Sequence, residues 1–440
     1  MACRIDDPPV DEAPVDEAPV CGHGYGLETV CLFLHLVLKA GVSLRGAVRV
    51  MDVANEVLGL ALDVPHWTTG RLWLLRLGHA KLAAAKPPAA DWAWLIDHSV
   101  QIGQEKCLVI LGIRLADLPP RGQCLAHEDM ELIELMPAKS WTRQQVDAAL
   151  EAAADKAGHV PRVIVDDRGV DLHGGVNLFQ QRHPKTAEIY DAKHKAACLL
   201  KGRLEKNPRW QAFVTLVGQS RCAVQQTELA SLAPPAPKPK ARFMNIGPQL
   251  AWGQRTLAIL RQPPPSLVRS VGRLKQKLGW IEDFADELTE WSQFQQVLEV
   301  SVSQINCRGI ERGAAKRLEA QLGQLDGLSD KAKELARQMV QFVAEQQSLA
   351  RRGERFPGST EVLESCFGKF KQLEKQQSRG GFTQLLLGFG SLVARLVPES
   401  VRQALQASGT AQVREWVKPN LGLTLFAQRK LAYAGATKDG

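Results

Sequence analysis

The sequence has no two cysteines in a Cys-x-x-Cys arrangement, although it contains nine cysteines in 440 residues. Zinc ribbons need such closely spaced pairs, and an odd number of scattered cysteines is not typical of a disulfide framework. We therefore expect reduced thiols and a cytoplasmic protein. A long apolar segment is also missing, because the most apolar early run, VCLFLHLVL (30–38), is too short to span a bilayer. No basic segment precedes this run, so we expect neither a signal peptide nor a membrane as partner.

The composition is that of a globular protein that can bury a core, with 45% hydrophobic and 23% charged residues. A chain of 440 residues suggests roughly two to four domains. The net charge of +8 permits contact with a polyanion such as DNA but is too modest to require it. Composition alone therefore keeps nucleic-acid binding open without selecting it.

Shifts in composition divide the chain into five segments. The acidic, proline-rich repeat VDEAPVDEAPV (10–20) has no apolar face, which predicts disorder. Two proline-containing linkers, AKPPAAD (85–91) and LAPPAPKPKAR (232–242), interrupt the periodic parts of the chain. The predicted segments are a disordered tail over 1–22, a helical domain over 23–84, the first part of an α/β core over 92–205, an all-α insertion over 206–355, and a final helical region over 356–440.

Three helical patterns fill the domain over 23–84, and their layout is that of a helix-turn-helix DNA-binding domain. The first pattern ends at Gly41, and Ser43 is suited to cap the second. The third, HWTTGRLWLLRLGHAKL (66–82), is basic and would be the recognition helix. Its candidate DNA contacts are Arg71, Arg76 and Lys81. A small helical bundle with incidental basic residues is the alternative.

Five β-rich runs follow the first linker, with helical patterns after the third, fourth and fifth of them. The order is therefore βββαβαβα, which predicts a mixed five-stranded sheet with helices on its faces. The runs are WAWLIDHSVQIG (92–103), KCLVILGIRL (106–115), MELIELMPA (130–138), VPRVIVDD (160–167) and TAEIYD (186–191).

Aspartates occur in two of these runs. Asp97 lies in the middle of the first, where a carboxylate is costly to bury unless it meets a metal ion, a cation or hydrogen-bond donors. Asp166 and Asp167 end the fourth run, a position at which aspartates also commonly start a turn. Because the first and fourth strands are neighbours in this strand order, these acids can meet at one edge of the sheet.

A third acid lies late in the chain, in STEVLESCFGKFK (359–371). This stretch predicts a helix with one apolar stripe. Glu364 and Lys371 lie off that stripe, seven residues apart and thus two turns along one face. A solvated helix face is the plain alternative for this pair.

The strand order, with Asp97 on the first strand and Asp167 closing the fourth, resembles the RNase H-like catalytic domain of DDE transposases from bacterial insertion sequences. That family carries Tyr, Arg, Glu and Lys on its last catalytic helix, with the Lys seven positions after the Glu, as Glu364 and Lys371 are here. The Tyr and Arg positions hold Pro357 and Thr360 instead. Some members also insert a helical domain before the Glu helix, which the stretch 205–355 would match.

The resemblance implies a two-metal enzyme whose catalytic metal ligands are Asp97, Asp167 and Glu364. Asp191, at the end of the fifth strand run, is an alternative third acid, and Asp166 is an alternative to Asp167. The implied cofactor is two Mg²⁺ ions, for which Mn²⁺ could substitute. Lys371 would contact a DNA phosphate near the bond that is cut.

The implied activity is strand cleavage and strand transfer by in-line attack at phosphorus. Its partners would be double-stranded DNA, both as transposon terminal inverted repeats and as target, and a further copy of the chain in a homodimer or larger synaptic complex. The implied location is the bacterial cytosol or nucleoid. The alternatives are a catalytically inactive, transposase-derived DNA-binding protein and an RNase H-like nuclease.

Overall fold

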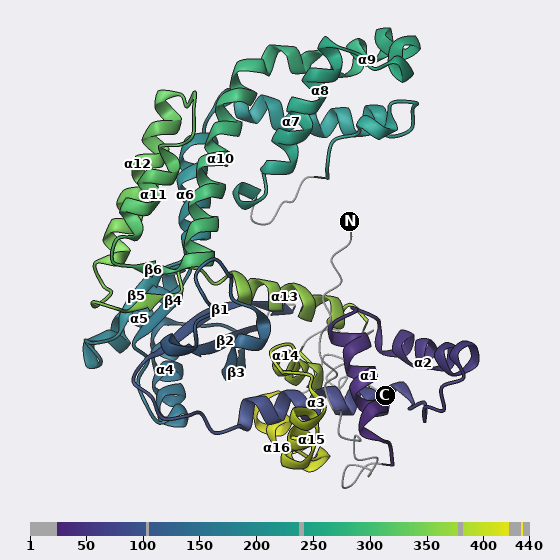
Figure 1. The fold of residues 1–440 in the computed structure, drawn as a ribbon, viewed down its shortest axis with the longest axis vertical. Coiled ribbons are helices and arrows are strands. Elements are labelled where there is room, and N and C mark those ends of the chain that lie inside the picture. Colours follow the sequence, from purple (N-terminus) through teal and green to yellow (C-terminus); the bar gives the residue numbers. More distant parts are fainter. Residues whose placement is uncertain (1–23, 103–104, 237–241, 377–381, 422–432, 434–440) are drawn as a thin grey trace, which may run out of the picture.

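A computed structural model describes residues 24–102, 105–236, 242–376, 382–421 and 433 (Figure 1). The tail predicted over 1–22 lies outside these residues. The described part of the chain is mainly helical and is built around one five-stranded sheet. No helix in it is both long enough and apolar enough to cross a bilayer.

The sheet confirms the mixed five-stranded arrangement predicted from the sequence. Its strands lie in the order β3-β2-β1-β4-β5. Neighbours β1–β2 and β2–β3 pair antiparallel, whereas β1–β4 and β4–β5 pair parallel. The strands are β1 (Trp92–Ile102), β2 (Glu105–Arg114), β3 (Glu131–Ala138), β4 (Val163–Asp166) and β5 (Ala187–Tyr190).

Three helices follow strands in the predicted order. They are α4 (Arg143–Ala157) after β3, α5 (Val170–Arg182) after β4 and α6 (Ala192–Leu204) after β5. Thr142 begins α4 with a capping box, because its hydroxyl accepts from the Gln145 amide while the Gln145 side chain accepts from the Thr142 amide. These local signals explain why sequence periodicity was sufficient to predict this part of the fold.

Alternate residues of β1 face two different cores, as the strand period requires. Trp92, Trp94 and Ile96 pack with side chains of α4 and α5 on one face. Ala93 and Leu95 belong to the larger core on the other face. On that second face lies helix α13 (Glu361–Glu374), which packs against β1. The buried residues of α13 form the predicted apolar stripe: Val362, Leu363, Cys366, Phe367, Phe370 and Leu373.

The insertion is helical, as predicted, and its helices rise from one end of the sheet, with α7, α8 and α9 farthest from it (Figure 1). Its far end is held together by buried aromatic rings, of which Trp210 and Trp291 meet edge to face at 4.9 Å. A short two-stranded ladder, β6 with β7, closes its base. The elements are α7 (Pro208–Val224), α8 (Gly247–Arg261), α9 (Val271–Leu278), α10 (Ala285–Arg308), β6 (Ile310–Glu311), α11 (Ala314–Leu322), α12 (Asp330–Gln347) and β7 (Arg355–Phe356).

The N-terminal helices and the C-terminal helices pack together around α3 (Figure 1). Gly78 of α3 permits the closest approach, because a Cβ added there would lie 1.8 Å from the carbonyl oxygen of Leu387. The described helices before the sheet and those after α13 therefore form one helical body. Its helices are α1 (Leu27–Leu38), α2 (Leu44–Leu58), α3 (Trp67–Ala83), α14 (Gly388–Ser391), α15 (Pro398–Ala407) and α16 (Thr410–Asn420).

Candidate active site

Asp97 lies in the middle of β1, on the face of the sheet against which α13 packs. It pairs in register with Val109 of β2, and the ladder shifts register between Asp97 and Val100. The side chain is 7% exposed. Strand alternation puts it on the same side as Leu95 and Ala93. The β1 carboxylate thus faces the layer that contains Glu364.

Asp167 directly follows β4, the parallel neighbour of β1. The parallel register of β1 with β4 pairs Leu95 with Val165, and the two aspartates each follow two residues later. The Oδ1 atom of Asp167 accepts a hydrogen bond of 2.8 Å from the Gly169 amide. Asp167 therefore also starts the turn after β4, and its other oxygen is not used by that turn.

Asp166 occupies a different environment, on the face covered by α4 and α5. It is fully buried, and neither carboxylate oxygen has a hydrogen-bond partner among the described residues. Burial, followed by the charges of Glu188 and Asp167, raises the pKa of Asp166 to about 8. Asp166 is therefore largely protonated at neutral pH. A neutral carboxyl that faces away from α13 is a poorer metal ligand than Asp167.

Glu364 lies in the first turn of α13 and is held by a lysine that the sequence did not single out. Its Oε2 atom accepts from the Nζ of Lys193, on α6, at 2.9 Å. The same ammonium contacts Oε1 of Glu361 at 3.3 Å. Burial lowers the pKa of Lys193, but the hydrogen bond and charge of Glu364 outweigh it and raise the pKa overall. Lys371 is exposed two turns further along α13.

Asp191 joins the start of α6 to the start of α13. Its Oδ1 atom accepts from the His194 amide at 2.7 Å, which caps α6. Its Oδ2 atom accepts from both the amide and the hydroxyl of Thr360, at 2.6 and 2.7 Å. The residue is 1% exposed. A metal ion at Asp191 would have to replace these hydrogen bonds.

Oxygen donors from carboxylates are the ligands that Mg²⁺ prefers, so the chemistry of Asp97, Asp167 and Glu364 suits that ion. Within the described residues, however, no three His, Cys, Asp or Glu side chains converge so that they could hold a metal ion. The three acids therefore do not form a ready-made metal site in this conformation. The contact that most directly opposes such a site is the ammonium of Lys193 on Glu364.

The helix-turn-helix predicted over 23–84 is not confirmed, since two of its three candidate DNA contacts are engaged inside the protein. Arg76 is 8% exposed and donates to the carbonyl oxygens of Leu405 and Ser408. Lys81 forms an ion pair of 2.9 Å with Glu131 of β3. Arg71 is half-buried. Helix α3 is thus the centre of the helical body rather than an exposed recognition helix. The partners of Arg76 lie more than three hundred residues away in the sequence.

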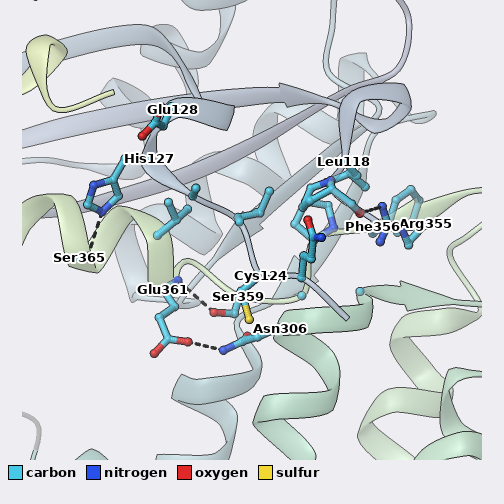
Figure 2. Close-up of a pocket in the computed structure, with 18 of the residues that line it drawn as sticks. Leu118, Cys124, His127, Glu128, Asn306, Arg355, Phe356, Ser359, Glu361 and Ser365 are labelled. Carbon is cyan, nitrogen blue, oxygen red and sulfur yellow. Dashed lines mark hydrogen bonds between the residues drawn. The ribbon is translucent and has the colours of Figure 1, made fainter. Parts of the chain in front are cut away.

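A cavity of about 580 Å³ lies along α13, where Glu361, Val362, Ser365 and Lys369 line it but Glu364 does not (Figure 2). There, Nε2 of His127 lies 3.0 Å from the Ser365 hydroxyl, and Lys369 donates to its Nδ1 at 3.3 Å. Burial, then the charges of Lys369 and Lys39, lower the pKa of His127. Because Nδ1 accepts from an ammonium, Nε2 carries the proton and donates to Ser365. This pair therefore lacks the free base that a serine nucleophile requires.

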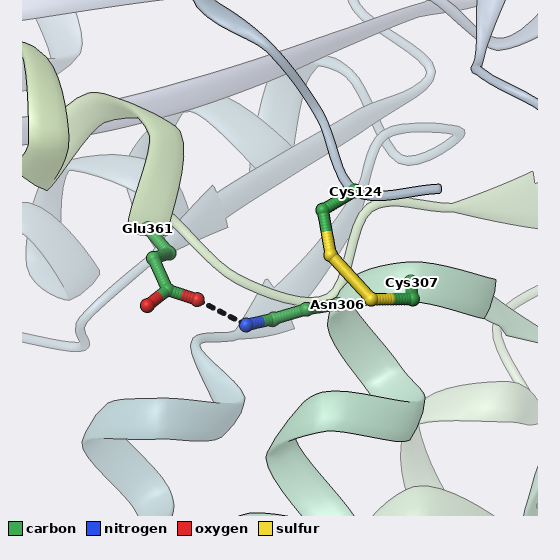
Figure 3. Close-up of a disulfide and its surroundings, with 4 residues drawn as sticks. All are labelled: Cys124, Asn306, Cys307 and Glu361. Carbon is green, nitrogen blue, oxygen red and sulfur yellow. Dashed lines mark hydrogen bonds between the residues drawn. A yellow bond between two sulfur atoms is a disulfide. The ribbon is translucent and has the colours of Figure 1, made fainter. Parts of the chain in front are cut away.

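A disulfide joins Cys124 and Cys307 (Figure 3). Cys124 lines this cavity and also a second one of about 410 Å³, which Cys307 and Lys193 line as well. Next to the disulfide, the Asn306 side chain donates to Glu361. The prediction that the thiols are reduced is wrong for this pair. Its cysteines lie 183 residues apart, so no local spacing could have revealed them. Five further cysteines in the described part of the chain are free: Cys31, Cys107, Cys198, Cys222 and Cys366.

For two residues of this site, no structural or functional role was predicted from the sequence. Lys193 lies two positions after Asp191, and Thr360 lies four positions before Glu364. A basic residue in the first turn of α6 could have been noticed as unusual, because cations are disfavoured near a helix N-terminus. Only the packing of α6 beside α13 shows what it does.

Comparison with known proteins adds no relative: no protein-family model matches the chain, and a search of curated proteins finds no match. Support for a function therefore comes from the geometry of the sheet, its aspartates and α13.

Proposed function

We propose that the protein is a DNA transposase of the insertion-sequence type, which binds transposon ends and catalyses strand cleavage and strand transfer by in-line attack at phosphorus. The observation that carries the proposal is the register of the two aspartates. Asp97 on β1 and Asp167, directly after β4, each lie two residues beyond the registered pair of Leu95 and Val165, and α13, which carries Glu364, packs against β1. These are the positions that the resemblance assigns to the three catalytic acids.

The direction of the strands gives a second line of support. Among the five described strands of the sheet, β2 runs opposite to the other four, and β1 lies at the centre. This is the arrangement expected of an RNase H-like domain. The helical insertion between β5 and α13 also lies where some members of that family carry one.

The third acid proposed is Glu364, and Asp191 is given a structural role instead. Both oxygens of Asp191 are used by hydrogen bonds that fix α6 and α13, whereas Glu364 is 33% exposed and accepts from a side chain that can move. We propose two Mg²⁺ ions as the cofactor, with Mn²⁺ as a substitute, and Lys371 as a phosphate contact.

The proposed partners are double-stranded DNA, as terminal inverted repeats and as target, and a second copy of the chain in a synaptic complex. End recognition by the N-terminal helices remains part of the proposal, but it does not use Arg76 or Lys81, which are bound internally. The net charge of +8 is compatible with such a partner.

A cleavage assay tests the proposal. Wild-type protein is incubated with Mg²⁺ and a labelled duplex that carries the sequences flanking the gene, and nicked and joined products are measured. Asp97→Asn, Asp167→Asn and Glu364→Gln should each lower cleavage by at least about 100-fold while DNA binding persists. Glu374→Gln, at the other end of α13, is the matched control and should remain active.

Wild-type protein that binds DNA without cutting it would point to the inactive derivative and overturn the enzyme proposal. Cutting of unrelated duplexes or RNA–DNA hybrids without strand transfer would instead indicate an RNase H-like nuclease. Full activity of Glu364→Gln together with an inactive Asp191→Asn would reverse the choice of third acid.

A further inference from the structure

The larger of the two cavities lies between segments that are far apart in the sequence. Its volume is about 580 Å³, and it is lined by the β2–β3 connection, the end of α10 and the stretch from β7 into α13 (Figure 2). Leu118, Leu125, Phe356 and Val362 give it apolar walls. A cavity of this size with a partly apolar lining is typical of sites for small organic molecules.

Covalent and ionic contacts hold the walls of this cavity together. The disulfide between Cys124 and Cys307 joins the β2–β3 connection to α10. Arg121, of the same connection, forms an ion pair of 2.6 Å with Glu311 of β6. At the other end of the connection, His127 contacts α13 at 3.0 Å. A ligand would therefore enter a largely pre-formed cavity and would not have to order its walls.

The two acids that line the cavity already have partners that balance their charge. Glu128 forms an ion pair with Lys39. Glu361 lies 3.3 Å from the ammonium of Lys193 and accepts a hydrogen bond from Asn306. A cationic ligand would have to compete with these partners, so the acids do not favour one.

Two cations that line the same cavity contact neutral acceptors instead. Lys369 donates to Nδ1 of His127 at 3.3 Å, and Arg355 donates to the Pro119 carbonyl oxygen at 2.6 Å. Neither cation forms an ion pair with an acid of the described residues. Burial, followed by the charge of Arg121, lowers the pKa of Arg355, which shows that its charge is incompletely balanced. A negatively charged ligand group would supply the missing counter-charge.

The two cations belong to opposite sides of the cavity. Figure 2 shows His127, the partner of Lys369, well apart from Arg355 and Phe356. We propose that this cavity binds a small organic dianion, with one negative group at Lys369, the other at Arg355, and an apolar body between them. The inference goes beyond the proposed function and does not rest on it.

Equilibrium dialysis of the full chain against naphthalene-2,6-dicarboxylate tests this, because the probe has an apolar body with a carboxylate at each end. At pH 8 the imidazole of His127 is neutral, since its pKa is lowered from the ordinary value. Lys369→Met and Arg355→Gln should each weaken binding of the probe about tenfold. The glutamine can still donate to the Pro119 carbonyl oxygen.

Matched controls separate charge from shape. Lys371→Met, on the same helix, and Arg352→Gln, just before β7, change exposed residues that do not line the cavity and should bind the probe as wild type does. Naphthalene-2,6-dicarboxamide has the shape of the probe without its charge. Wild type should bind it more weakly than the dicarboxylate, and neither Lys369→Met nor Arg355→Gln should change its affinity.

Unchanged affinity for the dicarboxylate in folded Lys369→Met and Arg355→Gln would overturn the inference. Equal weakening of the dicarboxylate and the dicarboxamide would overturn it too, because a change in cavity shape would then explain the loss. Displacement of the bound dicarboxylate by duplex DNA would assign the cavity to DNA instead of a small molecule. The proposed function fails separately, by absence of DNA cleavage in the wild type.

Discussion

At the scale of single residues, Asp191 and Glu364 differ in the hydrogen-bond partners of their carboxylate oxygens. We expect Asp191→Ala to lower the free energy of unfolding by about 2–4 kcal/mol, because it removes a helix cap and leaves the buried amide and hydroxyl of Thr360 without an acceptor. Urea denaturation would measure the loss. Asp155→Asn, exposed on α4, is the control. If Asp191→Ala kept its stability but lost metal binding, the interpretation that Asp191 joins α6 to α13 would be wrong.

Asp166 makes a prediction about pH. Its pKa is about 8 in the folded protein and near 4 when unfolded, so the folded state holds a proton that the unfolded state releases between these values. Its contribution to stability is therefore present below about pH 4 and is lost as the pH rises toward 8. Asp166→Asn stays neutral at every pH. Its free energy of unfolding should therefore rise relative to that of wild type by about 1 kcal/mol for each pH unit between pH 5 and 8. Denaturation of both proteins at several pH values measures this difference. Parallel plots of unfolding free energy against pH for wild type and Asp166→Asn would contradict the prediction.

At the scale of elements, the disulfide ties the β2–β3 connection to the end of α10. Because it closes a loop of 183 residues, its removal should lower the free energy of unfolding by about 2–5 kcal/mol. Cys307→Ser, or a reducing agent, should lower the melting temperature, while Cys222→Ser, an exposed free thiol, should not. The same melting temperature with and without reductant would show that the bond does not form in solution.

The contact of α3 with the C-terminal helices gives a second element-scale prediction. Gly78→Ala would place a methyl group against the Leu387 carbonyl, and we expect a loss of about 3 kcal/mol or more. Gly218→Ala, in α7, has open space around it and should gain about 0.5–1 kcal/mol from helix propensity. Thermal denaturation of both variants tests the packing. Equal effects of Gly78→Ala and Gly218→Ala would mean that α3 does not approach the Leu387 carbonyl as closely as in this structure.

These elements also show what a sequence can predict. The five strands and α13 follow local periodicity, which a strand of alternating faces or a helix with one apolar stripe must display. The burial of α3 could not be predicted from local periodicity, because the groups that Arg76 contacts come more than three hundred residues later in the chain. The same holds for Lys193, Thr360 and the cysteine pair, whose roles arise only where distant segments meet. The adjacency of the first and fourth strands, which carry Asp97 and precede Asp167, could be predicted because the order of strands and helices along the chain limits which strands can be neighbours.

At the scale of the whole molecule, the proposed function requires DNA to bind largely through its phosphates. The chain carries 55 Lys and Arg against 47 Asp and Glu, and binding by such a surface releases counterions from the duplex. We expect the affinity for a duplex of about 30 base pairs to fall about 100-fold as salt rises from about 50 to 200 mM. Fluorescence anisotropy would measure it. Glu364→Gln should show the same salt dependence, because it removes a proposed metal ligand and not a phosphate contact, whereas Lys371→Gln should have a shallower slope. Affinity that is insensitive to salt would contradict binding through phosphates and leave the aspartates of the sheet without their proposed substrate.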